Sequence, residues 1–172
     1  MKVKGIIKVI KEINKLKKIK LINDYAIGGG IAKNYYLEPQ FTLDLDIFVL
    51  IDTMGDFHNI YDYFRNKKCK IENVFIIIHD IPVQFLPSFV QPFLKDGIKQ
   101  SKVIKLNGTR TKILSAEYLT ATLLMSFRQK DKYAIKGLLK FVNKSRLERL
   151  LKRISNRNYP LYDRFKELTG NK

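Results

Sequence analysis

The sequence predicts an α+β protein in which strands and helices are followed by a helical C-terminal part. Strand-like and helix-like patterns alternate up to about residue 114, whereas every apolar pattern after Ser115 has helical spacing. Hydrophobic residues make up 45% of the 172 residues, enough to build a core. We therefore expect an α/β core over residues 1–114 and a helical region over residues 115–172 that packs on it.

The N-terminal elements lead into a run of three glycines. Apolar residues recur at helical spacing from Ile6 to Leu16 with lysines between them, which predicts an amphipathic helix. A solvated lysine face is favoured over a membrane-facing or RNA-facing one. "LINDYAI" then predicts a short strand, Gly28–Gly30 a turn, and "GIAKNYYLE" a helix that ends before Pro39. The side chains of this helix expected to face the core are Ala32, Tyr35 and Tyr36.

The middle of the chain has strand signals, and the end has helix signals. "FTLDLDIFVLI" predicts a strand buried in a sheet, and "DFHNIYDYFRNKK" predicts a helix. "ENVFIIIHDIPVQFLPS" predicts a hairpin that turns at His79–Asp80 and returns over Ile81–Leu86. "FLKDGIKQSKVIKLNGTRTKIL" has further turn and strand signals, including the hairpin pair Asn107–Gly108. Ser115 can cap the first of three helical segments, and the C-terminal residues predict a tail or a short helix.

Charge and composition limit the classes of partner and site. The net charge of +17 predicts attraction to polyanions such as RNA, DNA, nucleotides or an acidic protein. A single cysteine, Cys69, excludes an internal disulfide and a cysteine-rich zinc site, and the presence of only two histidines argues against a histidine metal cage. No run of eighteen apolar residues and no signal peptide is present, so a cytoplasmic protein without a membrane partner is expected.

Two features close in the sequence point to a phosphate and metal site. Asp44 and Asp46 alternate on a strand and therefore project from the same face, where their charges repel unless a cation or a basic group lies between them. Mg²⁺ is the common cation of this kind, held by one or two carboxylates and substrate phosphates. Glycines at a strand-to-helix turn let the backbone approach a phosphate, and the helix N-terminus offers free N–H groups. Each signal alone is weak, but together they indicate a nucleoside triphosphate.

The segment "GGGIAKNYYLEPQFTLDLDIFV" resembles the Gly-Gly/Gly-Ser … Asp-x-Asp signature of the DNA polymerase β-like nucleotidyltransferase superfamily. Among its branches, the small prokaryotic AbiEii/AbiGii-type branch, often regarded as toxin components, is the most similar. "HDIPVQFLPS", "TRTKILSAEYLTATLL" and "RQKDKYAIKGLL" resemble later segments of that branch, so the likeness extends from about Tyr25 to Leu139. The resemblance implies the nucleotidyltransferase fold: a mixed β-sheet flanked by helices, with a C-terminal helical segment.

The resemblance also implies roles for individual residues. Asp44 and Asp46 would bind Mg²⁺, with Mn²⁺ as the alternative ion. Thr42 would support the strand or a phosphate with its hydroxyl. Lys130 would lie near the triphosphate and Asp131 near the active centre; without the resemblance, both belong to an ordinary exposed helix turn. The phosphate-cradling turn would consist of Gly28, Gly29 and Gly30.

One position departs from the pattern of the superfamily. Catalytic members have a third carboxylate on a neighbouring strand, and here that setting reads Val83-Gln84-Phe85-Leu86. An amide can coordinate a cation weakly but cannot accept a proton from an attacking hydroxyl. Asp80 or Asp131 is the candidate substitute. His79 is more readily interpreted as a turn residue than as a catalytic one. Cys69 is interpreted as an incidental thiol, and Tyr35 and Tyr36 as core residues, not base-stacking ones.

The predicted function is nucleotidyl transfer. A nucleoside monophosphate would pass from an NTP to an acceptor hydroxyl on RNA, in particular tRNA, or on a protein. By the same resemblance the protein could be the toxin of a toxin–antitoxin pair with an antitoxin protein as partner. The alternative is a non-catalytic nucleotide- or RNA-binding module whose metal site is degenerate because of Gln84.

Overall fold

The computed structural model of the chain describes residues 3–170. Its contacts fall into two compact units. The first unit comprises Met1–Ala32 and Gln40–Leu114, and the second comprises Lys33–Pro39 and Ser115–Lys172. Among the described residues, no helix combines the length and the apolar character needed to cross a membrane.

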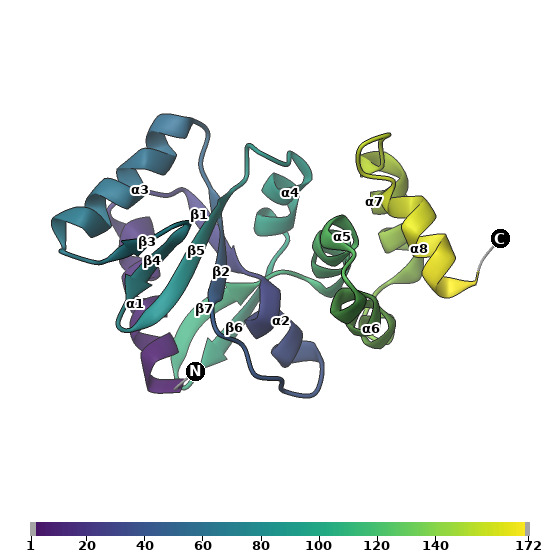
Figure 1. The fold of residues 1–172 in the computed structure, drawn as a ribbon, viewed down its shortest axis with the longest axis horizontal. Coiled ribbons are helices and arrows are strands. Elements are labelled where there is room, and N and C mark those ends of the chain that lie inside the picture. Colours follow the sequence, from purple (N-terminus) through teal and green to yellow (C-terminus); the bar gives the residue numbers. More distant parts are fainter. Residues whose placement is uncertain (1–2, 171–172) are drawn as a thin grey trace. The chain divides into compact units, whose positions relative to one another are not determined.

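A seven-stranded mixed sheet forms the centre of the first unit (Figure 1). Its strands follow the order β3-β4-β5-β2-β1-β7-β6, with β2 parallel to β5, β1 parallel to β7, and the other neighbours antiparallel. The mixed sheet that the resemblance implies is therefore confirmed. The strands are β1 (Asp24–Ile27), β2 (Leu45–Leu50), β3 (Ile71–Glu72), β4 (Phe75–Ile78), β5 (Ile81–Pro87), β6 (Lys102–Leu106) and β7 (Thr109–Ile113).

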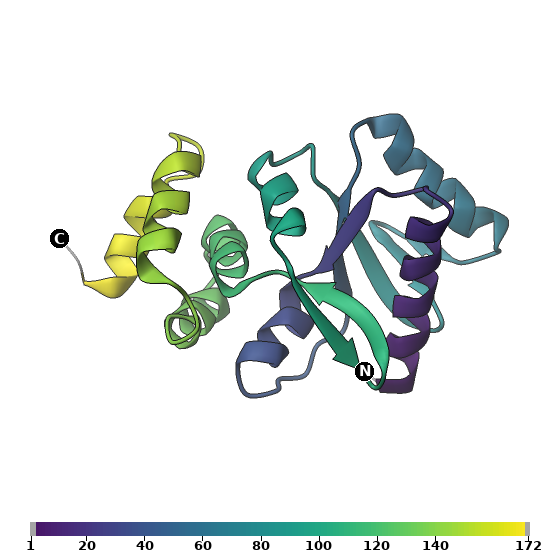
Figure 2. The same ribbon diagram turned by 180° about the vertical axis from the view of Figure 1, so that it is seen from behind.

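Helices cover both faces of this sheet. Figures 1 and 2 show α1 (Val3–Lys18) and α3 (Met54–Asn66) on one side and α4 (Phe93–Lys99) on the other. On the α1 and α3 side, alternate residues of β5 from Ile81 to Phe85 are buried, and the rings of Phe64 and Phe85 lie 5.8 Å apart. On the other side, α4 contacts β1 and β2. The core stripe of α1 comprises Val9, Ile10, Ile13 and Leu16, all fully buried.

The structure corrects three details of the predicted elements. Strand β2 begins at Leu45 and not at Phe41, because the preceding segment turns outward and leaves Phe41 79% exposed. The segment with turn and strand signals after Pro92 begins with helix α4, whose apolar residues face the core at helical spacing. Tyr35 is 42% exposed and does not face the core, because it lies one residue, or about 100°, around the helix from Tyr36.

A charged and hydrogen-bonded cluster joins α1, β1 and β7. Asp24 accepts hydrogen bonds from Lys17 at 2.7 Å and Lys112 at 2.5 Å. Burial alone would raise the pKa of Asp24, but these hydrogen bonds outweigh it and hold the pKa below its usual value. The buried Tyr25 hydroxyl lies 2.9 Å from the Thr111 hydroxyl, and burial raises the pKa of Tyr25 to about 12.

The second unit is helical apart from its connecting segments. Helix α5 contacts the other three C-terminal helices, and its residues are buried on almost every side. The buried Glu117 carboxylate of α5 accepts a hydrogen bond from the Asn143 backbone N–H at 3.0 Å. The C-terminal segment, predicted as a tail or a short helix, forms a helix. Within the described residues after Ser115, the helices are α5 (Ala116–Ser126), α6 (Gln129–Leu138), α7 (Lys144–Ile154) and α8 (Leu161–Thr169).

Candidate functional site

The three glycines connect β1 to α2 (Gly29–Tyr36): Gly28 lies between the two elements, and Gly29 and Gly30 are the first residues of the helix, which begins one residue earlier than the sequence predicts. Gly28 donates its backbone N–H to the carbonyl oxygen of Asp46 at 2.9 Å, which extends the pairing of β1 with β2 past the end of the strand. Gly29 has φ +50°, a conformation that favours glycine. The first N–H groups of a helix have no partner within it, so the start of a helix such as α2 is a position at which an anion can bind.

Each glycine approaches β2 or the segment before it so closely that an added Cβ would force a neighbouring side chain to move. A Cβ on Gly28 would lie 2.1 Å from the Phe48 ring, and one on Gly29 would lie 1.6 Å from Oδ2 of Asp46. A Cβ on Gly30 would lie 2.4 Å from Oγ1 of Thr42. Two of the three glycines therefore contact residues that the sequence assigns to the site, and the turn and the acidic motif form one structure.

The two carboxylates lie at the start of β2. Asp46 is the second residue of the strand, and Asp44 immediately precedes it; both are half-buried. The Thr42 hydroxyl donates to Oδ1 of Asp44 at 3.3 Å and lies 3.2 Å from the Asp44 carbonyl oxygen. The Thr42 hydroxyl therefore stabilises the segment that leads into Asp44. The resemblance implies that this hydroxyl supports the strand or a phosphate.

Gln84 occupies the neighbouring strand at the level of Asp46. Strands β2 and β5 are parallel, and Asp46 is in register with Gln84. Residues in register on parallel strands project from the same face, about 4.8 Å apart. The amide of Gln84, and not a carboxylate, therefore stands beside Asp46. Asp80 lies in the turn before β5 and is exposed, so it does not share this position.

The donor atoms at this site suit a hard cation. Asp44 and Asp46 offer carboxylate oxygens and Gln84 offers an amide oxygen, and Mg²⁺ prefers oxygen ligands. Within the part of the chain that the structure describes, no three or more His, Cys, Asp or Glu side chains gather around a common metal position. Two carboxylates are sufficient for Mg²⁺ when substrate phosphates and water complete its coordination.

Lys130 and Asp131 lie in the second unit, in the first turn of α6. Lys130 is exposed, whereas Asp131 is fully buried. The Asp131 carboxylate accepts hydrogen bonds from Nε of Arg128 and from the Ser126 hydroxyl, both at 2.8 Å. Burial alone would raise the pKa of Asp131, but these hydrogen bonds hold it below its usual value. Asp131 thus stabilises the start of α6.

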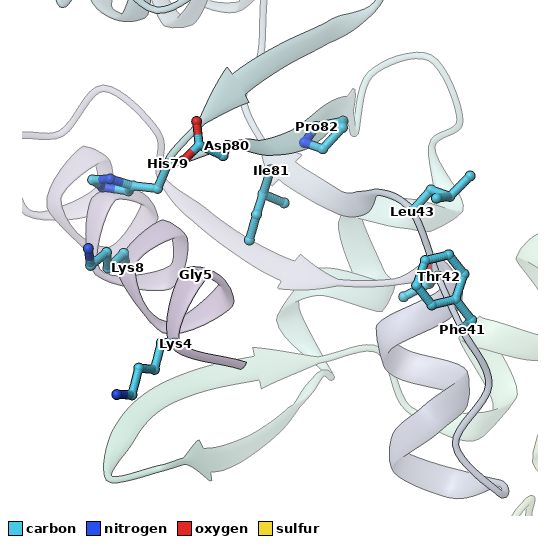
Figure 3. A pocket seen from close by; sticks show the side chains of 10 residues that line it. All are labelled: Lys4, Gly5, Lys8, Phe41, Thr42, Leu43, His79, Asp80, Ile81 and Pro82. Carbon is cyan, nitrogen blue, oxygen red and sulfur yellow. The ribbon is translucent and has the colours of Figure 1, made fainter. Parts of the chain in front are cut away.

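A pocket of about 550 Å³ lies in the first unit beside the acidic motif (Figure 3). One wall is the N-terminal part of α1, another is the segment that leads into β2, and the third is the His79–Asp80 turn with the first residues of β5. Sequence reasoning missed this pocket, because it interpreted the α1 lysines as a solvated face and Phe41 as part of a strand. Its lining residues are Lys4, Gly5, Lys8, Phe41, Thr42, Leu43, His79, Asp80, Ile81 and Pro82.

Comparison with solved structures identifies the architecture. The crystal structure of an antigenic nucleotidyltransferase-like protein from Paracoccidioides brasiliensis matches with a TM-score of 0.60 and 17% identity, covering 98% of this chain and 92% of that one. The chain has the nucleotidyltransferase fold. The fold class that the sequence predicts is therefore confirmed, while the AbiEii/AbiGii-type branch stays a prediction. No protein-family model and no curated protein matches the sequence.

Two structures of ANT(2″)-Ia show the same fold. The crystal structure in complex with adenylyl-2″-tobramycin has a TM-score of 0.53 and 12% identity, covering 84% of this chain and 93% of that one. The solution structure of this antibiotic-resistance factor has a TM-score of 0.55 and 12% identity, covering 95% of each chain.

Proposed function

We propose that the protein is a Mg²⁺-dependent nucleotidyltransferase, with Mn²⁺ as the alternative ion. The observation that carries this proposal is the approach of Gly29 to Asp46, where a Cβ would lie 1.6 Å from the carboxylate oxygen. This contact puts the N-terminus of α2, an anion site, directly against a carboxylate that suits a cation. A nucleoside triphosphate bound with a divalent cation presents both charges at once and therefore fits this arrangement.

In the proposed reaction, an acceptor oxygen attacks the α-phosphorus of the NTP. A new P–O bond forms, the bond between the α-phosphorus and the bridging oxygen breaks, pyrophosphate leaves, and the acceptor proton passes to solvent. Asp44 and Asp46 hold the cation, which neutralises charge on the phosphates when it is bound. The N–H groups of the glycine turn and the α2 N-terminus orient the triphosphate for in-line attack, and Lys130 is proposed to bind near it.

Gln84 is compatible with this reaction. Its amide oxygen can contribute to the cation site beside Asp46, but it cannot take the proton of the acceptor. In-line positioning of the triphosphate and neutralisation of its charge supply most of what such a transfer needs from a protein, so the reaction can proceed without a carboxylate base at this position. The loss of a third carboxylate therefore predicts a slower enzyme. If Gln84 instead abolishes transfer completely, the protein is the alternative, a non-catalytic nucleotide- or RNA-binding module.

The acceptor is proposed to be a hydroxyl on RNA, in particular tRNA, or on a protein. The net charge of +17 supports a polyanionic acceptor. The same charge supports an acidic antitoxin as partner, which predicts that the product of an adjacent small reading frame co-purifies with the protein.

The test is transfer of label from each α-³²P-NTP to total RNA and total protein, with and without Mg²⁺. Asp46→Asn should lower transfer at least about 100-fold, because it removes charge from the cation site. Asp62→Asn on α3 makes the same chemical change at a carboxylate that is 57% exposed, and it should leave transfer unchanged. NTP binding that requires Mg²⁺, without transfer to any acceptor, would support the non-catalytic module. Equal transfer by Asp46→Asn and the unchanged protein would refute the proposed enzymatic activity at this site.

A further inference from the structure

The pocket beside the acidic motif has a positively charged side. Lys4 and Lys8 line it from one face of α1, since residues four apart lie on the same side of a helix, and His79 lines it from the turn before β5 (Figure 3). Asp80 is its single acidic lining residue. Both lysines are exposed, and neither forms an ion pair or a side-chain hydrogen bond with another residue in the described part of the chain. Their charges are therefore available to an anion.

Another side of the pocket is apolar and unusually exposed. Phe41 is 79% exposed and Leu43 is 72% exposed, although they directly precede a strand that is buried in the sheet. Both line the pocket, with Ile81 and Pro82 beside them. An exposed aromatic ring offers a face on which a base can stack. Figure 3 shows Phe41 and Leu43 at one end of the pocket and Lys4, Lys8 and His79 at the other, so a ligand that combines phosphate with a planar ring meets both by extending along the pocket.

The His79–Asp80 turn, which completes the pocket, has two polar side chains on a strained backbone. His79 and Asp80 both have positive φ, 50° and 63°, in a two-residue hairpin. Asn-Gly is the relaxed solution for such a turn, and the chain uses it at Asn107–Gly108. At the pocket the turn instead places an imidazole and a carboxylate, at a conformational cost to the backbone.

The pocket is continuous with the segment that carries the carboxylates. Thr42 lines the pocket, and its hydroxyl lies 3.3 Å from Oδ1 of Asp44. Leu43, another lining residue, is bonded directly to Asp44 in the chain. The Thr42 end of the pocket therefore adjoins Asp44, whereas Lys4 and Lys8 line the pocket from the α1 face of the sheet.

We propose that this pocket binds the acceptor, and that the acceptor unit it takes is a phosphorylated nucleoside, supplied as a free nucleotide or as the end of a nucleic-acid strand. The proposal rests on the proposed nucleotidyl transfer. Phe41 stacks on a base at one end of the pocket, and Lys4, Lys8 and His79 bind phosphate at the other end. The same lysines repel polyamine acceptors such as aminoglycosides, whose amino groups are protonated at neutral pH. The pocket thus selects an anionic acceptor.

Binding is measured by fluorescence anisotropy with a 5′-fluorescein-labelled hexa-adenylate, while Mg²⁺ and a non-hydrolysable ATP analogue saturate the triphosphate site. The double variant Lys4→Gln/Lys8→Gln should weaken binding about tenfold or more and reduce the salt dependence by roughly the share of two phosphate contacts. Lys11→Gln/Lys15→Gln is the matched control: it removes two exposed charges with the same spacing from the same helix, outside the pocket lining. It should change affinity about twofold or less.

The ring is tested in the same assay. Phe41→Ala should weaken binding roughly 5-fold to 100-fold, as expected for the loss of one stacked base. Tyr133→Ala removes an aromatic side chain that is 68% exposed on α6 and should leave affinity unchanged. Competition by AMP as effectively as by unlabelled hexa-adenylate supports a free nucleotide, and competition by the strand alone supports a strand end. Tobramycin should not compete through the pocket.

Equal effects of the two lysine double variants would refute binding in the pocket, because affinity would then depend only on the net charge of the protein. Equal effects of Phe41→Ala and Tyr133→Ala would overturn the stacking ring. The two levels of proposal fail in different ways. Binding that depends on Lys4 and Lys8 without any transfer retains the pocket and overturns the enzyme. Transfer that depends on Asp46 but not on the lysine pair retains the enzyme and overturns the pocket.

Discussion

The contact between Gly29 and Asp46 is best tested by Gly29→Ala. Gly29 has φ +50°, and a left-handed conformation costs a non-glycine residue about 1–2 kcal/mol. The new Cβ would also lie 1.6 Å from Oδ2 of Asp46 and 2.6 Å from its Cγ, so the carboxylate must leave its rotamer at a further cost of about 1 kcal/mol. The expected loss of stability is about 2–3 kcal/mol, or about 4–12 °C in Tm for a chain of this size.

Gly108→Ala separates the backbone cost from the clash. Gly108 has φ +79°, but a Cβ added there would meet nothing within 4 Å, so only the cost of about 1–2 kcal/mol applies. Urea denaturation gives both losses, and Mg²⁺-dependent ATP binding shows whether the cation site survives. Gly29→Ala should abolish that binding, and Gly108→Ala should retain it.

A double-mutant cycle makes the reasoning refutable. In an Asp46→Ala background the carboxylate is absent, so Gly29→Ala should cost no more than Gly108→Ala does. The coupling between positions 29 and 46 should therefore be about 1 kcal/mol. Retained Mg²⁺-dependent ATP binding by Gly29→Ala, together with zero coupling, would refute a shared phosphate and cation site.

Four further predictions concern other positions. The pKa of Asp24 is lower in the folded protein than its usual value of 3.8. The contribution of Asp24 to stability is therefore complete above pH 3.8 and is lost as pH falls through the folded pKa. Asp24→Asn should make the stability of the protein less dependent on pH in this acidic range. Replacing His79–Asp80 by Asn-Gly should raise the free energy of unfolding by about 1 kcal/mol in urea titration, because both positions have positive φ. Asp131→Ala should cost about 0.5–2 kcal/mol, seen as a lower melting temperature, because it removes the carboxylate that caps the start of α6. Full transfer by the folded fraction would show that its role is structural. Gln84→Asp should lower Tm without Mg²⁺, since two carboxylates about 4.8 Å apart repel by a few kcal/mol, and added Mg²⁺ should recover the loss.

Local patterns predicted the acidic motif and the glycine turn, because both depend on residues that are close in sequence. The alternation of Asp44 and Asp46 before an apolar run required one orientation, and the structure has it. Helix α4 was missed because its interior glycine and short length resemble turn signals, and only burial of residues such as Phe93 and Ile98 against the sheet favours the helix.

The pocket could not be predicted because its walls are distant in sequence. Lys4 and Lys8 have the spacing of an ordinary solvated helix face, and nothing near them in the chain relates them to Phe41 or to His79. The parallel pairing of β2 with β5 and the packing of α1 at Ile81 bring these segments together. Contacts of this kind depend on tertiary structure, whereas local pattern indicates only that each side chain is exposed or buried.

The order of the glycine contacts explains why three glycines occur in succession. β1 runs antiparallel to β2, and its last residue, Ile27, pairs with Ile47. Continuing in that direction, Gly28, Gly29 and Gly30 meet Phe48, Asp46 and Thr42, so the chain passes from the buried strand toward the start of the motif. A side chain at any of the three positions would force a side chain of β2 or of the segment before it out of place. The run is therefore a close-packed seam and not a flexible turn, and it fixes the distance between the backbone proposed to bind phosphate and the carboxylates proposed to bind the cation. We expect the turn and the carboxylates to bind an NTP and its cation with little rearrangement of either.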